Sequence, residues 1–188
     1  RGLQLQLVVY MDAAMEMLRG QHPKKEILPG GILYYHIDDP VLESDTPLSD
    51  EEAEQALLFA LRPDGLVNSG EEIYRAMDQN FEGKSQMIPV EIKKNGEIST
   101  ARSKVASTEE FAVITRYAEH EIRQCGEAIY AGNIAVNPYR SDIETSCTYC
   151  PYASVCGMDA KIPGYEYRQF ASMKKEEVLD QMQTELAR

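Results

Sequence analysis

The sequence has no apolar run approaching the roughly 20 residues that a membrane-spanning helix needs. Its first residues, RGLQLQLVVYMDAAME, also lack the signal-peptide layout of charged start, apolar run and small-residue cleavage site. We therefore expect a cytoplasmic protein with no membrane association. An initiator methionine is missing and the chain opens inside an apolar run, which favours a piece of a longer protein.

Positive charge is scarce as well: 19 basic residues stand against 31 acidic ones, a net charge of -12. This balance excludes non-specific coating of nucleic acid, because such proteins need a basic face to replace counterions. Residues 84–104 run against it with five basic residues and two acidic ones, the basic ones being Lys84, Lys93, Lys94, Arg102 and Lys104. A solvated hairpin is the simpler interpretation, and contact with DNA is left open.

Helix and strand patterns are both present without a regular alternation, which favours the α+β class. We expect helices over residues 2–19, from the cap Ser49 to Pro63, and over 71–79, 108–130 and 174–186. A strand is expected after Gly30-Gly31, a turn at DGLVNS, and a β-hairpin over 87–100 with the two-residue turn Asn95-Gly96. We divide the chain into residues 1–20, 27–105 and 106–188.

The chain contains four cysteines, and three of them lie in SCTYCPYASVCGMD at C-x2-C-x5-C spacing: Cys147, Cys150 and Cys156. Such clustering is typical of metal binding rather than of a secreted disulfide scaffold. A zinc ribbon needs a second C-x2-C pair, whereas an iron–sulfur centre can take one thiolate from far away in sequence. We therefore expect an iron–sulfur cluster, with zinc and incidental thiols as the alternatives.

The fourth ligand of such a cluster is a separate question. Cys125 falls on the stripe that we expect the long helix to bury, which reads Phe111, Ile114, Ala118, Ile122, Cys125 and Ile129. A cysteine at such a position is more often a small core residue than a ligand. We therefore expect the fourth thiolate to lie outside this chain.

Within the first helix, Gln6 and Tyr10 are four residues apart and share one face. The segment GLQLQLVVYMDAAM resembles the Q-x-x-x-Y helix of the RecB-like nuclease domain in AddB-type proteins, the B subunits of bacterial ATP-dependent helicase–nucleases. The segments GGILYYHIDDP, GLVN, IPVEIKKNGEIS, VNPYR and the cysteine motif follow in that family's order. The resemblance covers essentially the whole chain.

The resemblance implies the C-terminal part of a PD-(D/E)XK nuclease domain, with helices around a small, mainly antiparallel sheet. The parent protein would process double-strand DNA ends for recombination and repair, cutting single strands as the complex unwinds DNA. It would work with an AddA-type helicase–nuclease subunit. ATP hydrolysis would belong to that partner, since the motif G-x-x-x-x-G-K-[ST] is absent here.

The resemblance also implies the sites. Gln6 and Tyr10 would support catalysis, while the Mg2+-binding Asp and the catalytic Lys would precede this chain and leave it inactive alone. Cys147, Cys150 and Cys156 would hold a 4Fe-4S cluster that staples the domain and supports binding to DNA ends. Glu91 and Lys93 also form an E-x-K on an expected strand, but we interpret them as hairpin charges. A zinc-stabilised interaction or DNA-binding module with no nuclease parent is the alternative.

Overall fold

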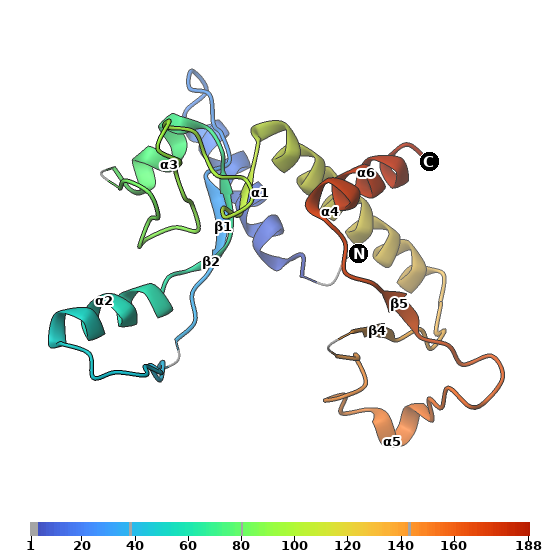
Figure 1. Ribbon diagram of the computed structural model, residues 1–188. Coiled ribbons are helices and arrows are strands. Elements are labelled where there is room, and N and C mark those ends of the chain that lie inside the picture. Colours follow the sequence, from blue (N-terminus) through green and yellow to red (C-terminus); the bar gives the residue numbers. More distant parts are fainter. Residues whose placement is uncertain (1–3, 38, 80, 143) are drawn as a thin grey trace. The chain divides into compact units, whose positions relative to one another are not determined.

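The computed structural model describes residues 4–37, 39–79, 81–142 and 144–188. Helices and short strands are mixed along the chain, so the predicted α+β class is confirmed (Figure 1). The chain forms two compact units that divide between Glu119 and His120, inside a helix, whereas the sequence placed segment limits near residues 20 and 105. Within the described residues, every helix is too short or too polar to span a bilayer.

The first unit is organised around one sheet. Its elements are α1 (Gln6–Gln21), β1 (Gly31–Tyr34), α2 (Asp50–Ala60), β2 (Asp64–Asn68), α3 (Glu71–Met77), β3 (Val105–Ala106) and the start of α4 (Thr108–Tyr130). The strand order is β1-β2-β3, with β1 antiparallel to β2 and β2 parallel to β3. The turn predicted at DGLVNS is therefore wrong. Its Asp-Gly and Asn-Ser ends have turn composition, but pairing on both edges makes it the central strand.

The core of the first unit packs around β2. Its buried cluster consists of Val67, Tyr74, Phe81, Ile88, Val90, Ile92 and Val105. Tyr74 of α3 meets Phe81 edge-on, with 6.2 Å between the ring centroids. Burial of each such side chain contributes about 1.5–3 kcal/mol, which holds α3 and the loops after it against the sheet.

Asn68, at the end of β2, links four segments of this unit. It is only 1% exposed. Its Nδ2 donates to the carbonyl oxygen of Pro29 at 2.8 Å and to Thr108 Oγ1 at 3.0 Å. Its Oδ1 accepts from the amide of Gly70 at 2.9 Å. One buried amide thus ties the chain before β1 and the starts of α3 and α4 to the sheet.

The helix starts follow local capping chemistry. Ser49 is the cap of α2, as predicted. Its Oγ accepts from the amide of Glu52, and Glu52 Oε2 accepts from the amide of Ser49, so the two residues form a capping box. The run Thr108-Glu109-Glu110 predicts a cap at Thr108 for α4. The structure instead has the same pair of bonds between Ser107 and Glu110, so Ser107 is the cap. α4 covers the predicted residues, whereas α3 begins at the predicted residue 71 and ends at Met77, short of the predicted limit at residue 79.

The predicted β-hairpin is only partly formed. Ile92 pairs with Ile98 as an isolated bridge, and no regular strand lies between residues 87 and 100. The two-residue turn at Asn95-Gly96 is wrong, because that turn type needs a positive φ at both central residues. Gly96 has φ of 86°, whereas Asn95 does not have a positive φ. The amide of Gly96 donates to the carbonyl of Lys93, so the turn is centred on Lys94 and Asn95.

α1 differs from expectation in its burial. It begins at Gln6, and the predicted helical positions 2 and 3 lie outside the described residues. Apolar residues at Leu5, Val8, Val9 and Met11 predict more than one buried face for this helix, but Val8 is its one buried residue among those described. Of its other apolar side chains, Leu7, Met11 and Met15 are half-buried, whereas Val9, Met17 and Leu18 are exposed.

The second unit contains the end of α4, β4 (Tyr139–Ser141), α5 (Ala153–Cys156), β5 (Arg168–Phe170) and α6 (Lys175–Leu186). β4 and β5 run parallel, and the rings of Tyr139 and Phe170 stack with centroids 5.6 Å apart. α6 lies where predicted. The buried stripe predicted for α4 ends at Ala118: Cys125 is exposed and Ile129 is 78% exposed.

Candidate functional site

Gln6 and Tyr10 meet on the exposed side of α1. Gln6 Nε2 donates to the hydroxyl oxygen of Tyr10 at 2.8 Å, and Tyr10 is 59% exposed. The four-residue spacing predicted this proximity, since such residues are neighbours on a helix. Because the hydroxyl oxygen accepts this bond, its own O–H remains able to donate to a ligand. The pair therefore presents one amide oxygen and one O–H donor together.

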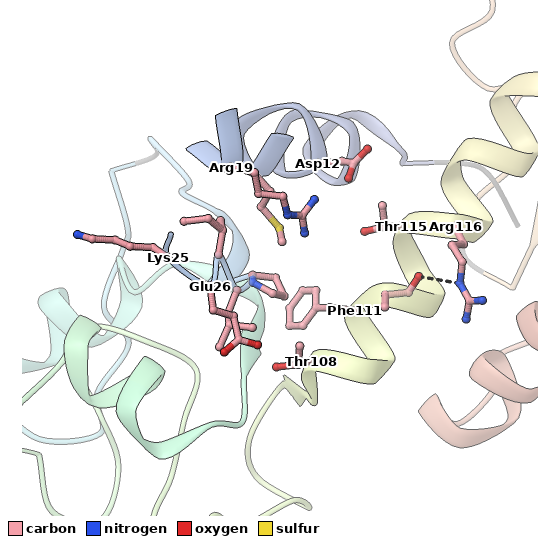
Figure 2. Close-up of a pocket in the computed structure, with 13 residues that line it drawn as sticks. Asp12, Arg19, Lys25, Glu26, Thr108, Phe111, Thr115 and Arg116 are labelled. Carbon is pink, nitrogen blue, oxygen red and sulfur yellow. Dashed lines mark hydrogen bonds between the residues drawn. The ribbon is translucent and has the colours of Figure 1, made fainter. Parts of the chain in front are cut away.

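A pocket lies on the opposite side of α1. Asp12, Met15 and Arg19 line it from α1, and Thr108, Phe111 and Thr115 line it from α4 (Figure 2). Its volume is about 550 Å³. Helix geometry separates this face from Gln6 and Tyr10, so the pocket is a distinct feature. The pocket residues of α1 are three and four positions apart, a spacing that places them on one face of the helix, but the sequence alone did not indicate a pocket on that face.

The alternative E-x-K pair is occupied by other contacts. Glu91 Oε1 accepts from Arg102 Nη1 at 2.9 Å, and Lys93 Nζ lies 3.7 Å from Glu97 Oε2. Asp78, which precedes this pair in the chain and could serve as its metal-binding Asp, accepts a hydrogen bond from the hydroxyl of Ser85 at 2.6 Å. These contacts agree with the interpretation of Glu91 and Lys93 as hairpin charges.

The sequence predicts an irregular cysteine segment with short helical turns, and in the structure the segment folds into consecutive tight turns. The amide of Cys150 donates to the carbonyl of Cys147, and the amide of Cys156, the last residue of α5, donates to the carbonyl of Tyr152, which precedes α5. Gly157 follows with φ of 64°, the left-handed conformation that ends a helix without a Cβ clash. All three thiols are free and half-buried.

The donor types in this segment fit an iron–sulfur or zinc centre, because thiolates are the preferred ligands of both. Their arrangement does not yet form one: nowhere in the part of the chain described here do three cysteine, histidine or carboxylate side chains gather as a metal site needs. Cys125 likewise belongs to no such group among the described residues. The iron–sulfur cluster and its ligation by Cys147, Cys150 and Cys156 thus remain predictions.

Comparison with known proteins gives the family. A family model described as the PD-(D/E)XK nuclease superfamily matches residues 1–157. The chain is 38% identical over 185 residues to the B subunit of an ATP-dependent helicase/deoxyribonuclease from Thermoanaerobacter sp. (strain X514), covering 98% of the chain and 16% of that protein. It is 40% identical over 186 residues to the protein of the same name in Lachnoclostridium phytofermentans, and this match covers 94% of the chain and 16% of that protein.

The chain thus spans about 16% of the length of the curated relatives it matches. The family model, in contrast, covers most of this chain, from the Gln6–Tyr10 helix through the three cysteines of the loop. On that match, the chain belongs to the PD-(D/E)XK nuclease superfamily.

Proposed function

We propose that this chain forms part of the nuclease domain of a bacterial ATP-dependent helicase–exonuclease that processes double-strand DNA ends for recombination and repair. The observation that carries the proposal is the match along 98% of the chain to a relative named as the B subunit of a helicase/deoxyribonuclease. The reaction is hydrolysis of DNA phosphodiesters in the cytoplasm, with an AddA-type subunit as partner. Membership of a nuclease superfamily argues against a zinc module with no nuclease parent.

Gln6 and Tyr10 support catalysis in this proposal. Gln6 holds the Tyr10 hydroxyl in one orientation at 2.8 Å, so the O–H is directed away from Gln6. An exposed, oriented O–H can donate to a phosphate oxygen whose negative charge grows during hydrolysis. Gln6 Oε1 remains available to orient a lysine, a water molecule or DNA.

A divalent metal such as Mg2+, when bound, polarises the scissile phosphate and activates water in nucleases. Among the described residues no three suitable side chains gather to hold it. We therefore propose that its ligands and the catalytic Lys come from outside this chain. The 188-residue chain alone is expected to show no metal-dependent cleavage of DNA.

We propose further that Cys147, Cys150 and Cys156 hold a 4Fe-4S cluster whose fourth thiolate lies elsewhere in the parent protein. The tight turns of this segment and its three free thiols support the proposal. The cluster would join the cysteine segment to a distant part of the parent and so stabilise the domain that receives DNA ends. Cys125, exposed on α4, has no part in it.

The test of the Gln6–Tyr10 role is a Tyr10→Phe variant of the parent protein in complex with its partner subunit. Loss of the hydroxyl is expected to lower kcat for DNA cleavage about 10- to 100-fold, the value of one hydrogen bond to a charged group. Tyr130→Phe serves as the matched control, since Tyr130 is 96% exposed. Equal rates for both variants would remove Tyr10 from the reaction.

A further inference from the structure

The basic segment 84–104 is divided by the fold into engaged and available cations. Arg102 pairs with Glu91 at 2.9 Å, and Lys104 Nζ lies 2.7 Å from both oxygens of Asp64. Lys84 Nζ lies 3.7 Å from the centroid of the Phe59 ring. Three of the five cations are thus already committed to contacts within the chain.

The other two, Lys93 and Lys94, line a pocket of about 570 Å³ together with Arg75 from α3. Lys93 meets Glu97 at 3.7 Å with both side chains more than half exposed, so this pair contributes little. Lys94 has no ion pair within the described residues. Glu82 is the acidic residue of the lining, so the pocket carries an excess of positive charge in a chain whose net charge is -12.

Arg75 is held in place at the wall of this pocket. Its Nη1 donates to the carbonyl of Phe81 at 3.0 Å, and its guanidinium lies 5.1 Å from the Phe81 ring centroid. Its Nη2 and Nε groups form no hydrogen bond among the described residues. A guanidinium fixed at one edge retains donors in the forked geometry that suits phosphate oxygens.

The rim of the pocket leaves room for a chain-like ligand. Gly83 and Gly96 line it with φ of 71° and 86°, and a Cβ at either would meet nothing within 4 Å. Phe81 is 7% exposed and therefore presents no ring face on which a base could stack. A ligand here would be held through its backbone charge and not through its bases.

We propose that Arg75, Lys93 and Lys94 form a binding site for the phosphodiester backbone of a DNA strand. The inference rests on the proposed function, which supplies a DNA strand to this domain. The acidic remainder of the surface repels DNA, and at about 0.1 M salt charges interact over only about 10 Å, so the attraction is confined to this pocket. The contact is independent of base sequence.

The test compares two double variants of the parent protein in complex with its partner. Lys93→Ala/Lys94→Ala removes the available cations, and Lys24→Ala/Lys161→Ala removes two exposed lysines elsewhere with the same change in charge. Binding of a fluorescent single-stranded oligonucleotide is measured by anisotropy from about 50 to about 200 mM salt, with EDTA to prevent cleavage. Thermal unfolding verifies that each variant is folded.

Two phosphate contacts to single-stranded DNA contribute about 1.4 to the slope of log K against log salt. The Lys93→Ala/Lys94→Ala variant is expected to lose that amount, and its affinity at about 0.1 M salt falls about 25-fold if the contacts add nothing at about 1 M. The control keeps the original slope. Arg75→Lys, which retains charge without the fork, is expected to weaken binding with no change in slope.

Three outcomes overturn the proposal and are distinguishable. If wild-type protein binds DNA and both double variants have its slope, the pocket is not on the DNA path. If inorganic phosphate binds and only the Lys93→Ala/Lys94→Ala variant loses it while DNA binding is unchanged, the site takes small phosphates. If wild-type protein does not bind DNA in this assay and does not cleave DNA when Mg2+ replaces EDTA, the proposed function fails together with this site.

Discussion

Replacement of Asn68 by alanine tests whether one buried amide holds the first unit together. The change removes three hydrogen bonds, to Pro29, Gly70 and Thr108, each with a net value of about 1 kcal/mol. It also leaves the Pro29 carbonyl oxygen without its side-chain donor in a buried position. We therefore expect the free energy of unfolding to fall by about 3 kcal/mol, a large part of the roughly 5–15 kcal/mol typical of a domain.

The assay is urea unfolding of the chain followed by far-UV circular dichroism, because the sequence contains no tryptophan. A loss of about 3 kcal/mol shifts the midpoint by about 1–3 M urea for ordinary m-values. Asn95→Ala is the matched control: its side chain bonds Glu97 in an exposed turn, and its loss is expected to cost under about 1 kcal/mol. Equal costs for the two variants would refute the reasoning.

Three further predictions concern the glycines, one ion pair and the cysteines. Gly65→Ala places a Cβ 2.1 Å from the carbonyl oxygen of Ile32 at a residue with φ of 147°, so it is expected to lower the free energy of unfolding by more than about 2 kcal/mol. Gly126 lies in α4 with open space around it, so Gly126→Ala is expected to raise the free energy of unfolding by about 0.5–1 kcal/mol. Urea unfolding measures both changes. A hydrogen bond from Lys104 lowers the pKa of Asp64, so this pair stabilises the fold above the unfolded pKa of about 3.9, and the stabilisation is lost as the pH falls through the lowered pKa. Lys104→Met is therefore expected to lower the free energy of unfolding by under about 1 kcal/mol at about pH 7 and not at all in strong acid. Equal costs at both pH values would contradict this. In the anaerobically purified parent, Cys150→Ser is expected to abolish the brown visible absorption and the bound iron and sulfide, whereas Cys125→Ser is expected to keep all three. Stoichiometric zinc in the wild-type protein would contradict the iron–sulfur cluster.

Locally encoded features were predictable from the sequence. The capping box of Ser49 and Glu52 needs only residues three apart, and the Gln6–Tyr10 contact needs only the helical repeat. α4 was likewise placed by its apolar spacing, although its second half stays exposed in the described structure. In each case the interaction that decides the structure lies within one or two helical turns.

Features that depend on distant residues were not predictable. β2 becomes a strand because β1 and β3 pair with it on either side, and the residues of DGLVNS alone do not indicate which strands will pair with it. Arg75 joins Lys93 and Lys94 across a gap of about twenty residues, so charge counting along the chain missed it. The cysteine spacing indicates a metal loop, but the remaining ligand of the predicted cluster is a question of tertiary structure.

The parallel pairing of β2 with β3 also sets an order of events during synthesis. β2 can pair with β1 as soon as residue 68 has left the ribosome, but its other edge stays open until Val105 and Ala106 follow. Pairings between residues far apart in sequence form late, because the intervening loop must close first. For the time needed to translate that stretch, the nascent chain exposes an unpaired strand edge, which is a template for aggregation. Slow codons placed between residues 68 and 105 are therefore expected to lower the soluble yield.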